Sequence, residues 1–120
     1  MIKRIVIAGS RDYLDYDEAK KYIDICLESI DKKHKIIILS GGAKGADALG
    51  ERYAIENNIE LEKYPAEWSK YGRKAGPIRN RRMAELCDIV ICFWDGKSKG
   101  TRSLIDYAAK LEKNTLIKLI

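Results

Sequence analysis

The sequence has little of what several common chemistries require. It holds one histidine, His34, in the polar stretch DKKHK, and its three cysteines do not form a CxxC pair. Zinc sites and histidine-dependent catalytic triads both need convergent His or Cys side chains. Neither GxGxxG nor GxxxxGK[ST] occurs, which disfavours a standard dinucleotide site and a P-loop. We therefore expect no bound metal and no cofactor.

Long apolar runs are also lacking. No stretch approaches the roughly 20 apolar residues of a membrane-spanning helix. The opening residues, MIKRIVIAGSRD, carry too short an apolar segment for an export signal and are typical of a first strand. Without an export signal the cysteines are most simply reduced thiols, which predicts a cytoplasmic protein with no membrane partner.

What is present fits one globular unit. The 120 residues are 46% hydrophobic and 34% charged, and no repeat, low-complexity tract or linker interrupts them. Residues 1–120 are therefore expected to form a single domain with its own core. The formal net charge of +5 favours an anionic partner, but it does not separate a nucleotide from a polymer.

Short apolar runs alternate with helix-periodic segments along the chain. This alternation predicts a Rossmann-like α/β fold, a three-layer α/β/α sandwich with a mainly parallel five-stranded sheet and four helices. The segment 66–76 is expected to be irregular. The expected strands are 4–8, 35–39, 59–64, 88–94 and 115–120, and the expected helices are 17–31, 46 to about 57, 77–86 and a last one from about Thr101.

Unusual residues gather in the loops that follow the strands. In parallel α/β sheets, ligands bind beyond the carboxyl ends of the strands, near the point where strand order reverses. The loops expected there are 9–13, 40–46, 65–79 and 94–101. All four carry glycines, arginines or aromatic residues that plain connections do not need, so we expect the binding site at this edge.

The most informative loop is SGGAKGAD, residues 40–47, which lies between an apolar strand and a helix. Glycines let backbone amides approach a ligand closely, and the start of the next helix offers free N–H groups and a positive dipole end. This geometry suits a phosphate. A tight strand-to-helix turn is the alternative for the glycines. Asp47 either complements the helix start or contacts a sugar or base.

Two further loops repeat this pattern. In AGSRDY, residues 8–13, Gly9 allows close approach, Ser10 can donate to a phosphate and Arg11 can pair with one bidentately. In DGKSKGTRS, residues 95–103, Gly100 gives flexibility and Thr101 is expected to cap a helix that offers its amides to an anion. Surface turns with an ordinary cap are the alternative for both.

Basic and aromatic residues are interleaved between 68 and 82. Arg79 and Asn80 stand near an expected helix start beside the cleft, so we expect them to touch the ligand. Trp68 either covers a base or lies in solvent, and Trp94 is expected in the core or the cleft wall. Such interleaving also suits single-stranded nucleic acid. For the remaining cations, a solvated face is preferred: Lys70, Lys74 and Arg82.

Taken together, the motifs IAGSRDY, LSGGAKGADALGERYA, YPAEW, AGPIRNRRM and DIVICFWDGKSKGT resemble the YspA-like branch of the SLOG superfamily over nearly the whole chain. That superfamily includes the LOG phosphoribohydrolases and the DNA-processing protein DprA. The resemblance implies a Rossmann-like fold that binds the phosphate or ribose of a nucleotide-derived ligand. The residues that the resemblance implies as ligand-binding are Gly9, Ser10, Arg11, Gly41, Gly42, Gly45, Asp47, Arg79, Asn80, Gly100 and Thr101. Ser40 belongs to the glycine loop 40–47 and is added to this set as a phosphate-binding candidate.

Departures from the relatives leave three hypotheses for function. Leu104 stands where LOG enzymes carry a catalytic glutamate, which favours a binding or sensing module. A hydrolase of an N-glycosidic or phosphate bond would need another acid or base, with Glu67, Asp47 or Asp95 as candidates beside Arg79. DprA-like binding of single-stranded nucleic acid through residues 68–82 is the third. LOG-type relatives form dimers through their helices, so the resemblance also makes a homodimer a candidate assembly.

Overall fold

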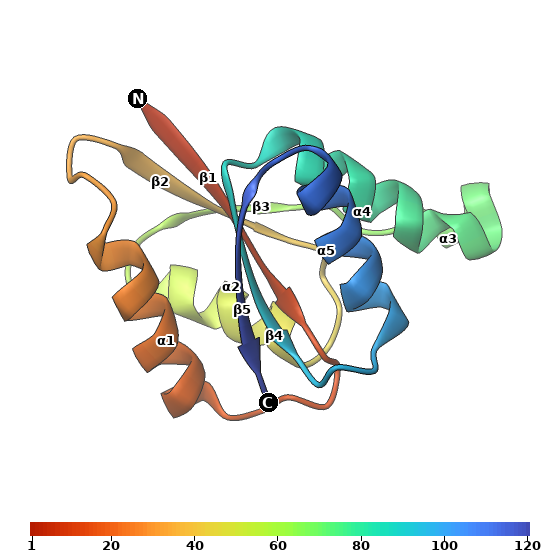
Figure 1. Ribbon diagram of the computed structural model, residues 1–120, viewed down its shortest axis with the longest axis horizontal. Helices are drawn as coiled ribbons and strands as arrows, with labels where there is room; N and C mark the ends of the chain where they lie inside the picture. Colours follow the sequence, from red (N-terminus) through yellow and green to blue (C-terminus); the bar gives the residue numbers. More distant parts are fainter.

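A computed structural model describes all residues, 1–120, and forms one five-stranded sheet flanked by helices (Figure 1). The strand order is β3-β2-β1-β4-β5, and every neighbouring pair is parallel. The predicted Rossmann-like fold is thereby confirmed. The elements are β1 (Ile2–Gly9), α1 (Tyr16–Glu28), β2 (Lys35–Ser40), α2 (Ala46–Glu56), β3 (Glu60–Lys63), α3 (Trp68–Tyr71), the 3-10 helix η1 (Gly72–Lys74), α4 (Ala75–Leu86), β4 (Ile89–Trp94), α5 (Lys99–Lys110) and β5 (Asn114–Leu119).

The central strand β1 divides the core into two layers. Its side chains alternate between faces, because successive residues of a strand point in opposite directions. Ile5 and Ile7 pack in one cluster with residues of α1 and α2, whereas Val6 and Ala8 pack in the other with residues of α4 and α5. Both faces of the sheet are therefore covered, which explains the consecutive apolar residues in β1, β2 and β4.

Strand order reverses beside β1. The chain runs from β1 outward to β2 and β3, then crosses over the sheet to β4 and outward again to β5. The loops after β1 and β4 consequently diverge to opposite faces. A crevice is expected at this switch point in open α/β sheets.

The segment between β3 and β4 differs from its prediction. Residues 68–71 form the short helix α3 and residues 72–74 a 3-10 turn, where an irregular segment was expected. In Figure 1, α3 extends from one end of the molecule. Helix α4 begins at Ala75, two residues before the expected start. Pro77 is accommodated in the first turn, where its missing N–H would have no helical partner.

The start of α5 was also predicted wrongly. Ser98, not Thr101, is the residue at the N-cap, and the helix begins at Lys99. The Asp95 carboxylate accepts hydrogen bonds from the backbone N–H groups of Lys97 and Ser98, both at 2.8 Å. These bonds end the loop early, so Thr101 lies inside the first turn.

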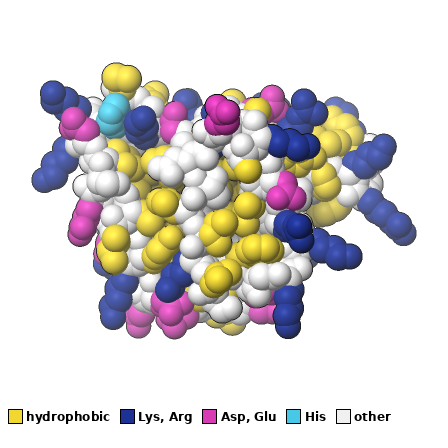
Figure 2. All heavy atoms as spheres, in the orientation of Figure 1, with side chains coloured by type: hydrophobic (Ala, Val, Ile, Leu, Met, Phe, Trp, Pro, Cys, Tyr) yellow, Lys and Arg dark blue, Asp and Glu magenta, His cyan; other side chains and the backbone are white.

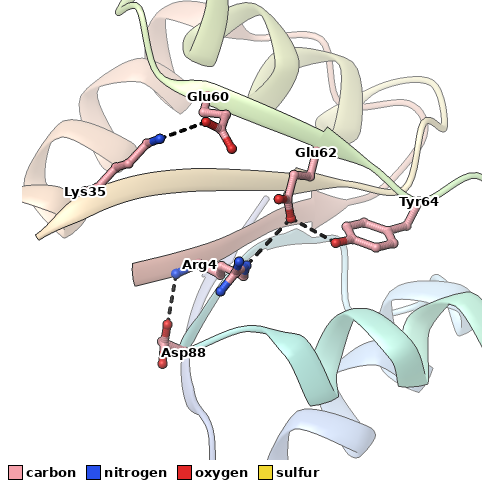
Figure 3. A network of polar contacts seen from close by, with 6 residues as sticks. All are labelled: Arg4, Lys35, Glu60, Glu62, Tyr64 and Asp88. Carbon is pink, nitrogen blue, oxygen red and sulfur yellow. Dashed lines mark hydrogen bonds and ion pairs between the residues drawn. The ribbon is translucent and has the colours of Figure 1, made fainter. Parts of the chain in front are cut away.

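Charged residues surround the short edge strand β3 (Figure 3). Lys35 pairs with Glu60 at 2.9 Å, and Glu62 accepts a hydrogen bond from the Tyr64 hydroxyl at 2.9 Å. Glu62 also lies 3.7 Å from the Arg4 guanidinium. Such charges disfavour pairing of an exposed strand edge with another chain.

The four longer helices, α1, α2, α4 and α5, cover the sheet with one face each. In α5, for example, Thr101, Leu104 and Ala108 are buried at spacings of three and four residues. None of the helices combines the length and the apolar character that crossing a membrane would require.

Candidate functional site

A cleft of about 400 Å³ opens at the carboxyl ends of β1 and β4. Its walls come from three separate parts of the chain: the loop after β1, the glycine loop before α2, and the facing ends of α4 and α5. The lining residues are Ala8, Gly9, Arg11, Asp12, Ala43, Asp47, Arg79, Asn80, Met83, Ser98, Gly100, Thr101 and Leu104.

Gly45 brings the glycine loop against the loop after β1. Its φ of +74° is in the region that favours glycine, and a Cβ here would overlap the backbone carbonyls of Arg11 and Ser10. The backbone N–H of Ala46 donates to the Ser10 carbonyl at 3.2 Å. Gly45 is therefore required for the close packing of the two loops, and it lies behind the cleft wall.

Several amides of the glycine loop already have acceptors within the chain. Gly42 N–H donates to the Ser40 hydroxyl at 3.1 Å, and Ala43 N–H donates to the Asp47 carboxylate at 3.2 Å. Ser40 is fully buried and donates in turn to Glu51 at 2.6 Å. These bonds brace the loop from below, so Ser40 supports it and does not face the cleft.

The start of α5 offers amides that remain open. Hydrogen bonding within α5 begins with Arg102, whose N–H donates to the Ser98 carbonyl at 3.1 Å. The N–H groups of Lys99, Gly100 and Thr101 have no acceptor in the chain. Gly100 and Thr101 line the cleft, so this helix start can bind an anion there.

The loop before α5 is held rigidly by side chains. The Ser10 hydroxyl accepts from Asp95 N–H at 3.2 Å and lies 3.2 Å from the Ser98 hydroxyl. Trp94 Nε1–H donates to the Ser98 carbonyl at 3.1 Å. Hydrogen bonds from Ser98 and Lys97 lower the pKa of Asp95 and keep it ionised. These contacts orient the first amides of α5.

Arg79 lies half-buried at the junction of the loops. Its Nη1 donates to the Gly41 carbonyl, and its Nε donates to the Asn80 side-chain oxygen at 2.9 Å. Burial lowers its pKa, the Asp47 charge opposes this shift, and the Arg11 charge adds to it. Because a guanidinium stays protonated in proteins, Arg79 presents a partly desolvated positive charge.

Asp47 is the buried acid of the cleft, with 5% of its surface exposed. Burial raises its pKa, whereas hydrogen bonds from the Ala43 and Gly9 amides and the Arg79 charge oppose the rise. The Asp47 side chain does not cap α2, since Gly45 occupies that position without a side-chain bond. Asp47 therefore ties the loop to the helix while one side of it faces the cleft.

Asn80 connects the two helices that form the far wall. It is 7% exposed, and its amide nitrogen donates to the Gly100 carbonyl at 3.1 Å. Since its side-chain oxygen accepts from Arg79, both ends of the amide are engaged. Asn80 thus positions Arg79 and the start of α5 in addition to lining the cleft.

The structure separates the residues selected from the sequence into four groups. Those in the cleft are Gly9, Arg11, Asp47, Arg79, Asn80, Gly100 and Thr101. Gly41, Gly42 and Trp68 line an adjoining cavity of about 160 Å³. Glu67 lines a third cavity, of about 360 Å³. Outside the cleft lining are Ser10, Ser40, Gly45 and Asp95.

Two polar lining residues were missed by the sequence analysis. Asp12 follows Arg11 directly, and Ser98 precedes the helix that carries Gly100 and Thr101. Asp12 was interpreted as an ordinary loop residue. An acidic residue next to Arg11, in a loop that follows a strand, is the sequence feature that could have indicated a place in the cleft. Ser98 was hidden because Thr101 was taken as the cap.

Comparisons with known proteins agree with this architecture. A model of the YspA, cpYpsA-related SLOG family matches residues 3–71. The Gene 61 protein of Mycobacterium phage D29 is 30% identical over 115 residues, which cover 91% of this chain and 90% of the phage protein.

Two solved structures share the fold at low sequence identity. DNA processing protein A (DprA) from Streptococcus pneumoniae matches 98% of this chain with a TM-score of 0.73 and 20% identity, but this chain spans only 50% of it. The structure of TM1055 matches 96% of this chain, and the match covers 72% of the TM1055 chain, with a TM-score of 0.64 and 22% identity. The family match, which covers more than half of the residues, and the phage relative lead to one conclusion: this chain belongs to the YspA, cpYpsA-related SLOG family.

Proposed function

We propose that the protein binds a nucleotide-derived small molecule in the cleft at the strand ends. The observation that carries this proposal is the convergence of open α5 amides with Arg11 and Arg79 on one cavity of nucleotide size. In this arrangement the phosphate lies against Gly100 and Thr101, where helix dipole and guanidinium charges act together.

The mixed charge of the cleft favours a nucleotide over a bare polyanion. Asp12 and Asp47 line the same cavity as the two arginines. Carboxylates repel additional phosphates, but they accept hydrogen bonds from ribose hydroxyls. A ligand with one phosphate and a sugar satisfies both kinds of side chain. We therefore place the ribose beside the acids, with the phosphate beside the arginines and α5.

The adjoining small cavity is suited to the base. Gly41 and Gly42 line it without side chains, and Trp68, 54% exposed, lines it as well. Aromatic side chains stack on bases with little preference for sequence. This supports the assignment of Trp68 as the stacking residue. A Trp68→Ala variant should weaken AMP binding while leaving ribose 5-phosphate binding unchanged, as measured by calorimetry.

Calorimetric titration with AMP, ADP and ribose 5-phosphate tests the proposal. Arg11 is exposed and has no ion-pair partner, so Arg11→Ala removes a ligand contact without breaking the fold. Loss of one charge-assisted contact should weaken binding on the order of tenfold to a hundredfold. Arg81→Ala is the matched control, because Arg81 is exposed on α4, pairs with Glu85 and lies outside the cleft. Absence of binding to the wild-type protein would reject the proposal.

A hydrolase acting on the same ligand is the second candidate. Asp47 supports it, since a buried carboxyl with a raised pKa is suited to proton transfer. Of the other acids considered, Glu67 and Asp95 lie outside the cleft lining, and Leu104 lines it without a polar group. Incubation with AMP and NAD followed by chromatography would detect released base. Turnover abolished by Asp47→Asn would favour the enzyme over the binding module.

Binding of single-stranded nucleic acid is the third candidate. The DNA processing protein named above shares the fold, and residues 68–74 of this chain expose Trp68, Tyr71 and several cations. Figure 2 shows Lys and Arg side chains around hydrophobic ones at the end where α3 lies in Figure 1. Affinity for an oligonucleotide should fall steeply with salt and on Arg73→Ala. Weak binding without salt dependence would exclude it.

A homodimer in the cytoplasm remains part of the proposal. The edge strand β5 and its ends expose Ile117, Leu119 and Ile120, and Figure 2 shows hydrophobic side chains gathered over the middle of the same face. A second copy would cover them by packing the same face of the molecule against itself across a two-fold axis. Light scattering of the wild type and of Leu119→Lys tests this, since the variant should be monomeric.

A further inference from the structure

Arg79 and Asp47, two opposite charges of the cleft, lie close together without touching. A Cβ added to Gly41 would lie 2.8 Å from the guanidinium carbon of Arg79 and 2.9 Å from Oδ2 of Asp47. The separation of these two atoms is therefore no larger than the two distances combined. No ion pair joins the side chains, so their nitrogen and oxygen atoms are more than 4.0 Å apart. A narrow gap separates the two charges.

The width of this gap suits a single oxygen atom. Hydrogen bonds are roughly 2.7–3.2 Å long, so one oxygen can bond to two groups that are about 4–6 Å apart. The gap stays open because Gly41 has no side chain, whereas an alanine methyl group would lie within it. Arg79 and Asp47 both line the main cleft, so a group of a ligand bound there can reach between them.

The chemistry of the two side chains selects what can bind between them. A guanidinium only donates hydrogen bonds, and an ionised carboxylate only accepts them. Arg79 uses two of its five N–H groups within the chain, toward Gly41 and Asn80, and the others remain for the ligand. The bridging atom must accept from Arg79 and donate to Asp47, which a hydroxyl does. A phosphate is repelled by the acid, and an ammonium group by the guanidinium.

We propose that the gap between Arg79 and Asp47 binds one hydroxyl of the ligand's ribose and thereby selects nucleotides whose sugar carries that hydroxyl. This inference rests on the proposed nucleotide site and adds the sugar specificity of that site. Asp47 is 5% exposed, so a nucleotide that lacks the hydroxyl and covers the cleft leaves a buried carboxylate without a donor in the gap. An unsatisfied buried acceptor is costly, and this cost is the source of the selectivity.

Calorimetry with AMP and 2′,3′-dideoxyadenosine 5′-monophosphate tests the inference, because the two probes share base and phosphate. The dideoxy probe should bind the wild-type protein about tenfold to a hundredfold more weakly, the effect of one hydrogen bond to a charged group. Asp47→Asn preserves the shape of the side chain and should shrink this difference, since the two losses involve the same contact and do not add. Asp106→Asn is the matched control, because Asp106 is exposed on α5, pairs with Arg102 and lies outside the cleft lining. This control should keep the full difference.

The outcomes separate this inference from the proposed function. Equal affinities of the wild-type protein for the two probes, or a difference that persists in full in Asp47→Asn, would overturn the inference while leaving the nucleotide site in place. If neither probe binds the wild-type protein, the proposed function itself fails. The 2′-deoxy and 3′-deoxy isomers of AMP identify the bridging hydroxyl: one isomer should reproduce the loss and the other should not, because one oxygen fills the gap. Isomers that bind alike would contradict a single bridging hydroxyl.

Discussion

Substitution of Gly45 by alanine would test the packing on which the cleft depends. Gly45 has φ +74° and ψ −127°, a combination essentially restricted to glycine, which costs other residues about 1–3 kcal/mol. The added Cβ would also overlap the carbonyls of Arg11 and Ser10, which are backbone atoms and cannot rotate away. Overpacking of this kind adds roughly 1–3 kcal/mol. We therefore expect Gly45→Ala to lose about 2–6 kcal/mol of unfolding free energy.

The unfolding free energy is measured by urea titration followed by circular dichroism. Two other glycines provide controls of graded severity in this assay. Gly42 has φ +77° but open space around its Cβ position, so Gly42→Ala should cost only about 1–2 kcal/mol. Gly100 has open space and lies in the first turn of α5, so Gly100→Ala should be neutral or stabilising by roughly 0.4–1 kcal/mol. A Gly45→Ala protein as stable as Gly42→Ala would refute the contact between the two loops.

Three further substitutions test the electrostatics and bracing of the site. The raised pKa of Asp47 means that the folded state holds the proton of this carboxyl more tightly than the unfolded state does, so wild-type stability falls as the pH rises from the ordinary carboxyl range through the raised pKa. Asp47→Asn lacks this proton, so in chemical denaturation the variant should gain stability relative to wild type between pH 4 and pH 7. A stability difference that stays constant with pH would contradict this. Ser40→Ala leaves buried partners of its hydroxyl unsatisfied and should cost about 1–3 kcal/mol in the same assay, while the exposed Ser69→Ala should cost nothing. The lowered pKa of Asp95 implies a contribution that is present at neutral pH and lost as the pH falls through that pKa, so Asp95→Asn should lower the melting temperature at pH 7, and this difference should shrink as the pH is lowered into the acid range.

The fold was predictable because its strands carry an unambiguous pattern. Consecutive apolar, mostly β-branched residues such as Ile37, Ile38 and Leu39 are typical of a short strand covered on both faces, and the helices between such runs impose parallel crossovers. Helix α3 escaped prediction because four residues, WSKY, are too few to show a helical period, and none of them is buried. The start of α5 escaped because both Ser98 and Thr101 can cap, and bonds from Asp95 decide between them.

The sequence also indicated which loops meet, but not which side chains face the cavity. Ser10 and Ser40 have the chemistry of phosphate ligands, yet their hydroxyls bind groups within the chain, at Asp95 and Glu51. Such partners are distant in sequence, and only the folded chain brings them within reach. Arg79 was selected for its charge, whereas its central place among three cavities depends on how α4 packs beside the glycine loop.

A nucleotide bound in the cleft between the glycine loop and α5 should perturb the backbone amides on both sides of it. The backbone amide spectrum of the isotope-labelled protein, recorded during titration with AMP, detects this perturbation residue by residue. We expect concerted shifts of Gly100, Thr101 and the loop 41–43, with smaller changes elsewhere. An unchanged spectrum at saturating nucleotide, or shifts confined to the α3 and η1 segment, would contradict this expectation.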